Sequence, residues 1–262
     1  MRKFLAIIMA VAMMATLVCV VSAVDDSKVI VKYTFDNGAE SGLEEVGEGL
    51  TYADGAVTFG GGAYLKTGLD LSGVEALSVA FRVKPTGSTS WPFEITSEES
   101  HAYKTEHYLG VLLNTGIVAE RYGFKEEVEG RPDRPGNIVV GDVGTDYLDV
   151  VIVYPNDGTT IVYINGEEAG KYEGTDSEAF DLSIANCVGE TPELHIGWAA
   201  WNEASDGMVL DELVVYNTAL TADEVATALS ATGKAPQTGF ATIALAIAAI
   251  GSGAYIVSKK NH

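Results

Sequence analysis

The hydrophobic pattern is clearest near the carboxyl end, where an apolar strand leads into a capped helix. Val209–Tyr216 (VLDELVVY) is rich in Val, Leu and Tyr, which is typical of a strand buried over most of its length. Thr221 then fits an N-cap, and Glu224, three residues later, completes a capping box. Leu220 and Val225 occupy the two positions of a hydrophobic staple. The segment therefore predicts a buried strand followed by a short helix.

Two segments nearer the amino end show strand-like alternation. Val29–Phe35 (VIVKYTF) ends in aromatic residues and is followed by Asp36, Asn37 and Gly38, which favour a turn. In Leu77–Pro85 (LSVAFRVKP), Leu, Val, Phe and Val alternate with Ser, Ala, Arg and Lys. We expect the first segment to be the first strand. The second segment should be a strand with one face in the core and the other in solvent.

The second half of the chain contains the most secure strand-turn-strand prediction. Tyr147–Tyr154 (YLDVVIVY) and Thr159–Ile164 (TTIVYI) flank a turn at residues 155–158. Asn165 and Gly166 are typical of a type I′ hairpin turn, which leads into a further strand at Glu167–Tyr172. These segments predict three consecutive antiparallel strands.

Shorter patterns predict strands and loops in the rest of the chain. Asp54–Lys66 contains two short strands around the glycine run Gly60–Gly62, which we interpret as a tight hairpin because no helix follows to bind a phosphate. Glu40–Gly49 is acidic and glycine-bearing, which indicates a surface loop. Further strands are predicted at Trp91–Ile95, Tyr108–Leu113, Asn137–Val140 and Glu193–Trp198, the last with His195 as an ordinary strand residue.

The amino end has the features of a secretory signal peptide over residues 1–23. Arg2 and Lys3 precede the apolar run Phe4–Val21, and small residues follow at the expected cleavage site. Cys19 suggests a lipoprotein as an alternative, but Val18 stands where a lipobox has a small residue. We therefore expect a signal helix that is removed on export.

The carboxyl end predicts an anchor. A linker at residues 231–239 contains Pro236, Gln237, Thr238 and Gly239, and it precedes an apolar run at 240–257 and a basic tail at 258–262. The run is long enough for a transmembrane helix, and the basic tail fits a cytoplasmic end. This order resembles the sorting signal of Gram-positive bacteria, where sortase cuts after the threonine and joins it to peptidoglycan. Ala235 stands in place of the usual leucine, so a plain membrane anchor is an equal alternative.

The charge of the exported part excludes some partners. Four of the 16 basic residues lie in the two end segments and all 37 acidic residues lie between them, so the exported part has a net charge of −25. Such a field repels nucleic acid and anionic lipid, and it favours solubility or cations such as calcium. Cys187 is the only cysteine between the end segments, so an intrachain disulfide is excluded.

Four motifs of this chain match the pattern of one known family. They are GAVTFGGGAYL at 55–65, LSVAFRVKP at 77–85, YLDVVIVYPNDGTTIVYINGE at 147–167 and GMVLDELVVYNTALTADEVATAL at 207–229. Together they resemble the LamG-like branch of the concanavalin A-like lectin/glucanase superfamily.

This resemblance implies an all-β fold for residues 24–230, with two antiparallel sheets in a jelly-roll sandwich. In the family the first strand pairs near the last strand, which brings the two ends of the domain together. Many members hold a structural calcium ion near those strands, and Asp36 and Asp211 align with that position. The family includes sugar-binding modules, adhesive domains and glycosidase appendages, so the fold leaves the function open.

Sugar recognition needs flat aromatic faces together with amides and carboxylates. Aromatic residues on strands are more often part of the core. Trp201 is the first candidate, because it lies in a polar loop beside Asn202 rather than on a strand. The candidate ligand-binding residues are Trp201, Asn202, Trp198, Trp91, Tyr103 and Tyr122.

Catalysis and zinc binding have weaker support. Retaining glycosidases of the jelly-roll class carry Glu-x-Asp-x-Glu on one strand, and Glu126, Glu127 and Glu129 come nearest but sit in a loop with glycine and proline. Two carboxylates from separate strands could still meet in space. The acidic and histidine residues of Ser97–His107 match no zinc motif. We therefore assign no catalytic residue.

The sequence thus predicts a non-enzymatic binding module on the cell surface, with a glycan as its ligand. The first alternative is an adhesive or structural domain whose partner is a protein. The second is a glycoside hydrolase of the jelly-roll class.

Overall fold

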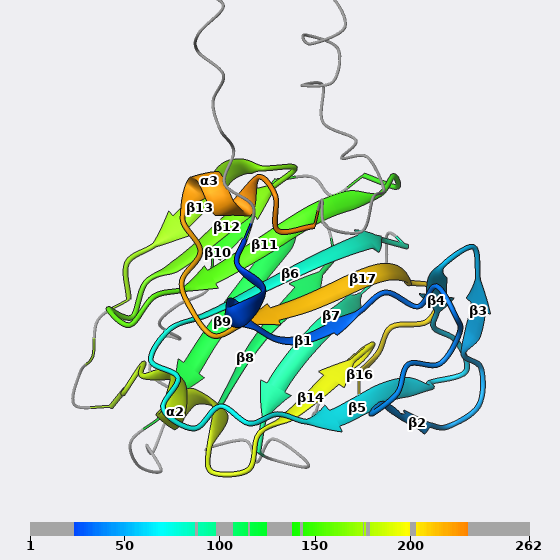
Figure 1. The fold of residues 1–262 in the computed structure, drawn as a ribbon, viewed down its shortest axis with the longest axis horizontal. Helices are drawn as coiled ribbons and strands as arrows, with labels where there is room; N and C mark the ends of the chain where they lie inside the picture. Colours follow the sequence, from blue (N-terminus) through cyan, green and yellow to red (C-terminus); the bar gives the residue numbers. More distant parts are fainter. Residues whose placement is uncertain are drawn as a thin grey trace, which may run out of the picture.

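The computed structural model is an all-β sandwich of two antiparallel sheets (Figure 1). It describes residues 24–86, 89–97, 107–114, 116–124, 138–141, 144–174, 176, 179–199 and 203–229. The predicted fold class is confirmed for this part of the chain. The predicted signal peptide, linker, transmembrane helix and basic tail all lie outside the described residues.

The first sheet has eight strands, and one of its inner strands, β17 (Val209–Tyr216), comes from the carboxyl end of the domain. The strands are β1 (Val29–Tyr33), β3 (Thr51–Ala53), β4 (Ala56–Thr58), β6 (Leu77–Lys84), β11 (Leu148–Tyr154), β12 (Thr160–Ile164), β13 (Glu167–Tyr172) and β17 (Val209–Tyr216). Their order is β13-β12-β11-β6-β17-β4-β3, and β1 also pairs with β17.

The second sheet has seven strands in the order β10-β9-β8-β7-β14-β5-β2. The strands are β2 (Glu44–Val46), β5 (Tyr64–Gly68), β7 (Ser90–Thr96), β8 (His107–Leu113), β9 (Ile117–Gly123), β10 (Ile138–Val140) and β14 (Glu193–Ile196). A two-stranded ribbon joins β15 (Trp198–Ala199) to β16 (Glu203–Ala204).

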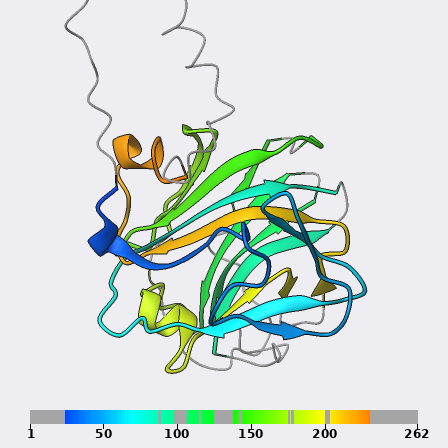
Figure 2. The same ribbon diagram turned by 45° about the vertical axis from the view of Figure 1, so that its right-hand side comes forward.

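Three short helices complete the described part. They are the 3₁₀ helix η1 (Asp26–Lys28) and the α-helices α2 (Ile184–Val188) and α3 (Ala222–Val225). Helix α2 contains Cys187 as a buried free thiol and packs against β7, β8 and β9 at one end of the sandwich (Figure 2).

Strand β17 joins the two ends of the domain. One edge pairs with β6, from Val209 opposite Lys84 to Tyr216 opposite Ser78. The other edge is shared, because Val209 and Leu210 pair with β4 while the second half pairs with β1. Figure 1 shows β1 alongside β17. The predicted meeting of first and last strands is therefore confirmed.

The core lies between the two sheets. The alternating residues Leu77, Val79, Phe81 and Val83 of β6 are all 0% exposed and belong to the main apolar cluster. The rings of Phe81 and Phe93 meet edge-to-face across the sheets, with centroids 5.8 Å apart. Each fully buried side chain of this size contributes about 1.5–3 kcal/mol to stability.

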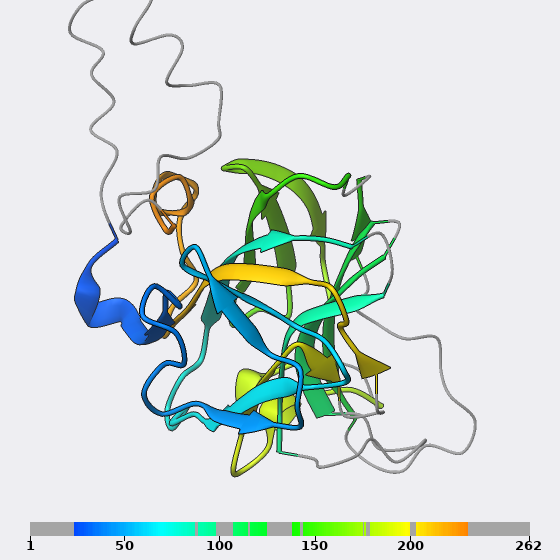
Figure 3. The same ribbon diagram turned by 90° about the vertical axis from the view of Figure 1, so that its right-hand side faces the viewer.

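The outer face of β6 is covered at one end, which corrects the prediction that it faces solvent. Ser78 and Ala80 are both 0% exposed. The Ser78 hydroxyl donates to the Thr218 carbonyl (2.8 Å) and accepts from the Leu220 N–H (3.0 Å). Ala80 belongs to a second apolar cluster with Leu220 and Val225. Figure 3 shows η1 and α3 on this outer side, so the capped helix closes part of the sheet face.

Local signals gave accurate bounds where turn or cap chemistry fixes the backbone. Asn165 and Gly166 have φ values of +52° and +83°, as a type I′ turn requires. Both halves of the capping box predicted at Thr221 and Glu224 are present. Strands β13 and β17 have the predicted bounds.

Other expectations were wrong or incomplete. The predicted surface loop Glu40–Gly49 contains β2, whose Glu44 pairs with Lys66 of β5. Strand β9 was not predicted because Glu120 and Arg121 interrupt its apolar pattern, yet both are buried, at 3% and 0% exposed. Arg121 satisfies its guanidinium with backbone carbonyls from the segments around α2 and β12. Helix α2 was also missed.

Glu224 provides a test of how the chain ends are joined. Its carboxylate pairs with Lys28 and accepts the Thr221 N–H, and these bonds lower its pKa from the usual 4.5. A lowered folded-state pKa stabilises the fold above the unfolded pKa, and this contribution is lost as pH falls through the folded value. We expect Glu224→Gln to reduce the free energy of unfolding at pH 7 by up to about 1 kcal/mol.

Urea unfolding at several pH values measures this effect. The difference between Glu224→Gln and the wild type should shrink below pH 4.5, the usual pKa of the carboxyl. Asp223→Asn on the same helix is the control, since Asp223 is exposed and should change stability far less. A difference that persists unchanged at acid pH would contradict the ion-pair explanation.

Candidate functional site

The outer face of the seven-stranded sheet presents polar and aromatic side chains along β5 and β14. Leu65 and Leu194 point into the core and are 0% exposed. The alternate positions face outward, and the register places Lys66 opposite His195 and Gly68 opposite Glu193. The outward-facing side chains of these two adjacent strands therefore form a row along the strand direction.

Tyr64 and Trp198 form an aromatic pair on this face. Their rings stack with centroids 4.7 Å apart and an interplanar angle of 13°. Both side chains are half-buried, so part of each remains accessible. The His195 ring meets Tyr64 and Trp198 at close to right angles, with centroid distances of 6.0 and 5.3 Å. Trp198 was a predicted ligand residue, whereas Tyr64 was not.

Gly197 explains how Trp198 reaches the same face as His195. Strict alternation along β14 would place residues 195 and 197 on one face and Trp198 on the other. Gly197 has a φ of +87°, which breaks the alternation, and its N–H donates to the Trp91 carbonyl (2.9 Å). A Cβ atom at this position would lie 2.2 Å from the Phe59 ring. Only glycine fits this turn without strain.

His195 connects the aromatic pair to two carboxylates. Its Nδ1 lies 3.3 Å from Glu94 Oε2, and its Nε2 lies 3.4 Å from Glu193 Oε2. The Glu94 side chain is fully buried, whereas that of Glu193 is 42% exposed. As predicted, His195 is a strand residue, and its ring is fixed from both sides.

Further along the sheet, two buried carboxylates lie in one row across three strands. Glu94 pairs with Gly110, and Gly110 pairs with Glu120, so both glutamates are on the same face. Tyr108 donates its hydroxyl to Glu120 Oε2 (2.8 Å). The glutamates come from β7 and β9, so their Cα atoms are about 10 Å apart at the usual spacing of strands.

Two other predicted ligand residues are buried in the same region. Trp91 is 1% exposed and donates its indole N–H to Glu203 Oε2 (2.8 Å). Tyr122 is 0% exposed and packs against Tyr108, with ring centroids 4.8 Å apart. Neither offers an open ring face to a ligand in this structure.

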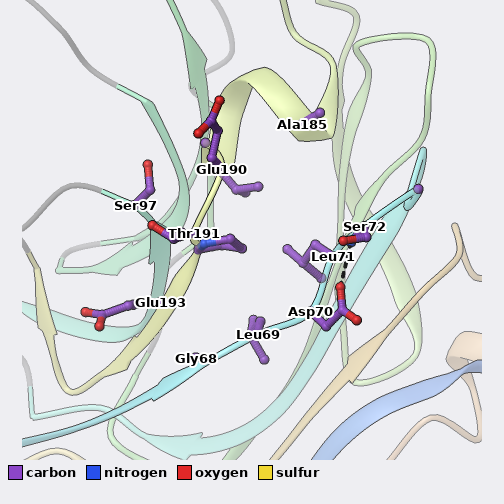
Figure 4. Close-up of a pocket in the computed structure, with 14 residues that line it drawn as sticks. Gly68, Leu69, Asp70, Leu71, Ser72, Ser97, Ala185, Glu190, Thr191 and Glu193 are labelled. Carbon is purple, nitrogen blue, oxygen red and sulfur yellow. Dashed lines mark hydrogen bonds between the residues drawn. The ribbon is translucent and has the colours of Figure 1, made fainter.

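A cleft opens at the end of β5 and β14, and we call it the end cleft. It has a volume of about 690 Å³ and lies between the β5–β6 loop and the α2–β14 loop. Figure 4 shows Leu69, Asp70, Leu71 and Ser72 on one side. The opposite side is formed by Ser97, Glu190, Thr191 and Glu193. The Leu69 N–H donates to the Pro192 carbonyl (3.0 Å), which ties the two loops together. No sequence pattern indicated this cleft.

The two residues predicted for calcium are placed differently. Asp36 is exposed in the turn after β1. Asp211 is buried, and its Oδ2 lies 3.6 Å from Nε of Arg82, whose Nη1 lies 3.4 Å from Asp149 Oδ1. Desolvation raises the pKa of Asp149. Within the described ranges, no three His, Cys, Asp or Glu side chains are grouped to hold a metal ion. Calcium at this position stays a prediction.

Several predicted residues lie outside the described part of the chain. They are Trp201, Asn202, Tyr103, the sorting motif Pro236, Gln237, Thr238 and Gly239, and the loop carboxylates Glu126, Glu127 and Glu129. Of the acidic and histidine residues considered for zinc in Ser97–His107, only His107 is described, and its Nδ1 lies 2.8 Å from the Asn186 carbonyl oxygen. Among the residues that the structure covers, no helix has the length and apolar character needed to cross a membrane.

A family model described as "Concanavalin A-like lectin/glucanases superfamily" matches residues 59–226. The chain belongs to this superfamily. The match includes β5, β14 and the end cleft, so the candidate site is part of the family fold. No curated protein matches the sequence.

Solved structures with the same fold include sugar-binding and protein-binding examples. One is domain 4 of AbnA, a GH43 extracellular arabinanase from Geobacillus stearothermophilus, in complex with arabinotriose. It is 21% identical with a TM-score of 0.53, over 76% of this chain and 97% of that chain. Another is the binding domain of botulinum neurotoxin DC in complex with rat synaptotagmin II. It is 10% identical with a TM-score of 0.54, over 78% of this chain and 52% of that chain.

A third similar structure is Trypanosoma rangeli sialidase, which is 14% identical with a TM-score of 0.55. The match covers 80% of this chain and 34% of the sialidase chain. This chain thus spans about half of the neurotoxin domain and about a third of the sialidase. At these identities the likeness shows a shared fold.

The geometry of Gly197 makes a testable prediction about the aromatic pair. Gly197→Ala should destabilise the protein by about 2–5 kcal/mol, because the substitution adds backbone strain and a clash with buried Phe59. Urea unfolding measures the change. Gly68→Ala is the matched control, because a Cβ atom added at Gly68 would meet no other atom within 4 Å and the residue has no positive φ. Equal stability of the two variants would contradict this placement of Trp198.

Proposed function

We propose that the protein is a non-catalytic glycan-binding module displayed on the outside of the cell. The Tyr64–Trp198 aromatic pair is the surface that contacts the sugar. The observation that carries this proposal is the partly exposed stack of two rings, bordered by His195, Lys66 and Glu193. A pyranose ring stacks its apolar face on an aromatic side chain, and neighbouring polar groups bind its hydroxyls.

The surroundings support a preformed site. Ser205 accepts the Trp91 N–H through its hydroxyl oxygen (2.7 Å), and Glu203 accepts the indole N–H of the same residue. These bonds hold the β15–β16 ribbon, which includes Trp198, against β7. A ligand then binds with little loss of conformational entropy.

The structural neighbours support a binding role in two ways. Domain 4 of AbnA was solved with arabinotriose, which favours a glycan ligand. The neurotoxin binding domain was solved with synaptotagmin II, which favours the alternative of a protein partner. We place the glycan first because of the aromatic pair. The predicted export and anchoring signals support a surface location, held either by sortase attachment to peptidoglycan or by the membrane.

Substitution of Trp198 tests this proposal. We expect Trp198→Ala to weaken binding of the best ligand on a glycan array by about 1–2 kcal/mol, or roughly 5- to 30-fold in Kd. Tyr147→Ala is the control, since Tyr147 is a half-buried aromatic residue directly before β11 of the other sheet, where Arg82 lies over its ring. Trp201→Ala in the same assay tests the first residue predicted from the sequence.

Two results would contradict the proposal. Equal loss with Tyr147→Ala would mean that the effect is not specific to this surface. An array without any signal, together with capture of a protein partner, would favour the adhesive alternative.

The Glu94–Gly110–Glu120 row supports a glycoside hydrolase as a second candidate. Inverting enzymes place two carboxyl groups roughly 6.5–9.5 Å apart, and strands two positions apart bring carboxylates to about this distance. Both glutamates are buried, at 0% and 3% exposed, which is why binding is the first proposal.

Release of reducing sugar from a polysaccharide panel tests this candidate. If the protein is a hydrolase, Glu94→Gln and Glu120→Gln should each reduce the rate at least about 100-fold, the usual contribution of an acid or base. Glu203→Gln is the control for general damage near the site. No release by the wild type would exclude the candidate for the substrates in the panel.

A further inference from the structure

The aromatic pair and the end cleft form one continuous surface. Glu193 lines the cleft, and its Oε2 lies 3.4 Å from Nε2 of His195, whose ring contacts both rings of the aromatic pair. Trp198 lies five residues beyond Glu193 in the chain, which is at most about 17 Å along a strand. An oligosaccharide of a few units is long enough to reach from the aromatic pair into the cleft.

Carboxylates dominate the charge of the end cleft. Asp70, Glu190 and Glu193 line it, and its lining in the described part of the chain includes neither lysine nor arginine. The Ser72 N–H donates to Asp70 (3.0 Å) and lowers the pKa of that carboxyl, which keeps it ionised at neutral pH. Lys66 beside the cleft is shared between Glu193 and a second glutamate on β2. The cleft thus attracts cations and repels anions.

The cleft also has the size and polarity of a small-molecule site. Its volume of about 690 Å³ is within the usual range for ligand pockets. Its lining combines the hydroxyl groups of Ser72, Ser97 and Thr191 with the apolar side chains of Leu69 and Leu71. Figure 4 shows these side chains from both loops around one space. Hydroxyls and aliphatic groups suit a sugar unit, and the carboxylates require that this unit be uncharged or positive.

We propose that the bound glycan contains amino sugars with free ammonium groups, and that the end cleft binds an ammonium group while a sugar ring stacks on Tyr64 and Trp198. This proposal rests on the proposed glycan-binding function. An ammonium group donates up to three hydrogen bonds, and charge-assisted bonds to carboxylates are stronger than bonds between neutral groups. Acetylation removes the charge, and a uronic acid would be repelled. A basic peptide would satisfy the carboxylates without using the aromatic pair.

Calorimetric titration of the purified protein with three tetrasaccharides tests this specificity. The probes are tetramers of glucosamine, N-acetylglucosamine and galacturonic acid. We expect the glucosamine tetramer to bind about tenfold more tightly than the acetylated tetramer at low salt, and the galacturonic acid tetramer to bind most weakly. The ratio of the Kd values of the acetylated and glucosamine tetramers should fall towards one in 1 M salt, where charges are screened.

A double variant with a matched control locates the effect in the cleft. Asp70→Asn with Glu190→Gln should remove the preference for the glucosamine tetramer. The control is Glu167→Gln with Glu168→Gln, which removes the same charge from exposed positions on β13, in the other sheet. It should leave the preference intact. Loss of preference in both double variants would show an effect of net charge alone and would overturn the proposal.

The outcomes separate this inference from the proposed function. If the first two tetramers bind equally and both need Trp198, the ammonium inference fails while the glycan-binding function stands. If no tetramer and no array glycan binds, both the ammonium inference and the proposed glycan-binding function fail. Tetralysine that binds as tightly as the glucosamine tetramer, with dependence on Asp70 and Glu190 but not on Trp198, would overturn the assignment to a sugar.

Discussion

The antiparallel pairing of β17 with β6 and β1 is the constraint on which the rest of the structure depends. Strand β17 is the last strand in the chain but lies inside the eight-stranded sheet, between β6 and the pair β4 and β1. Its pairing with β6 on one edge and with β1 on the other fixes where the chain ends meet. The Lys28–Glu224 ion pair and the capped helix α3 cover part of the outer face of this sheet. Because the eight-stranded sheet is fixed in this way, it provides a rigid layer against which the seven-stranded sheet packs.

How well each part of the fold was predicted follows from how local its causes are. The turn at Asn165 and Gly166 and the capping box at Thr221 depend on a few adjacent residues, so the sequence indicates them directly. Strand β9 is different. Arg121 can be buried there because it donates hydrogen bonds to backbone carbonyls that lie 34 or more residues away in the chain. No local pattern distinguishes such an arginine from one in solvent. The acidic β2 is likewise a strand only because β5 provides its partner.

The candidate site was predicted in part for the same reason. Trp198 could be chosen from its position at the end of a strand. Tyr64 is 134 residues away and looks like an ordinary strand aromatic, so only the register of β5 against β14 reveals the pair. The burial of Trp91 and Tyr122 follows the general tendency of strand aromatics to join packed regions. The end cleft depends on two loops that meet in space and has no sequence signature.

The outer face of the seven-stranded sheet thus combines features that a folded core does not require. The pair of stacked rings, the histidine held between two glutamates and the acidic cleft lie in succession along β5 and β14. Burial of the two aromatic rings against the core would stabilise the protein more than their partial exposure does. These features are the basis of the proposed binding site, whereas the outer face of the other sheet is covered in part by the segment around α3.

The central claim is that the ligand lies along the outward-facing side of β5 and β14. The most direct test is to titrate the isotopically labelled protein with its best-binding oligosaccharide and follow the backbone amide shifts by NMR. The account predicts the largest shifts at Tyr64, Lys66, Glu193, His195 and Trp198. Largest shifts on β11 and β12 of the other sheet, with none on β5 and β14, would contradict it.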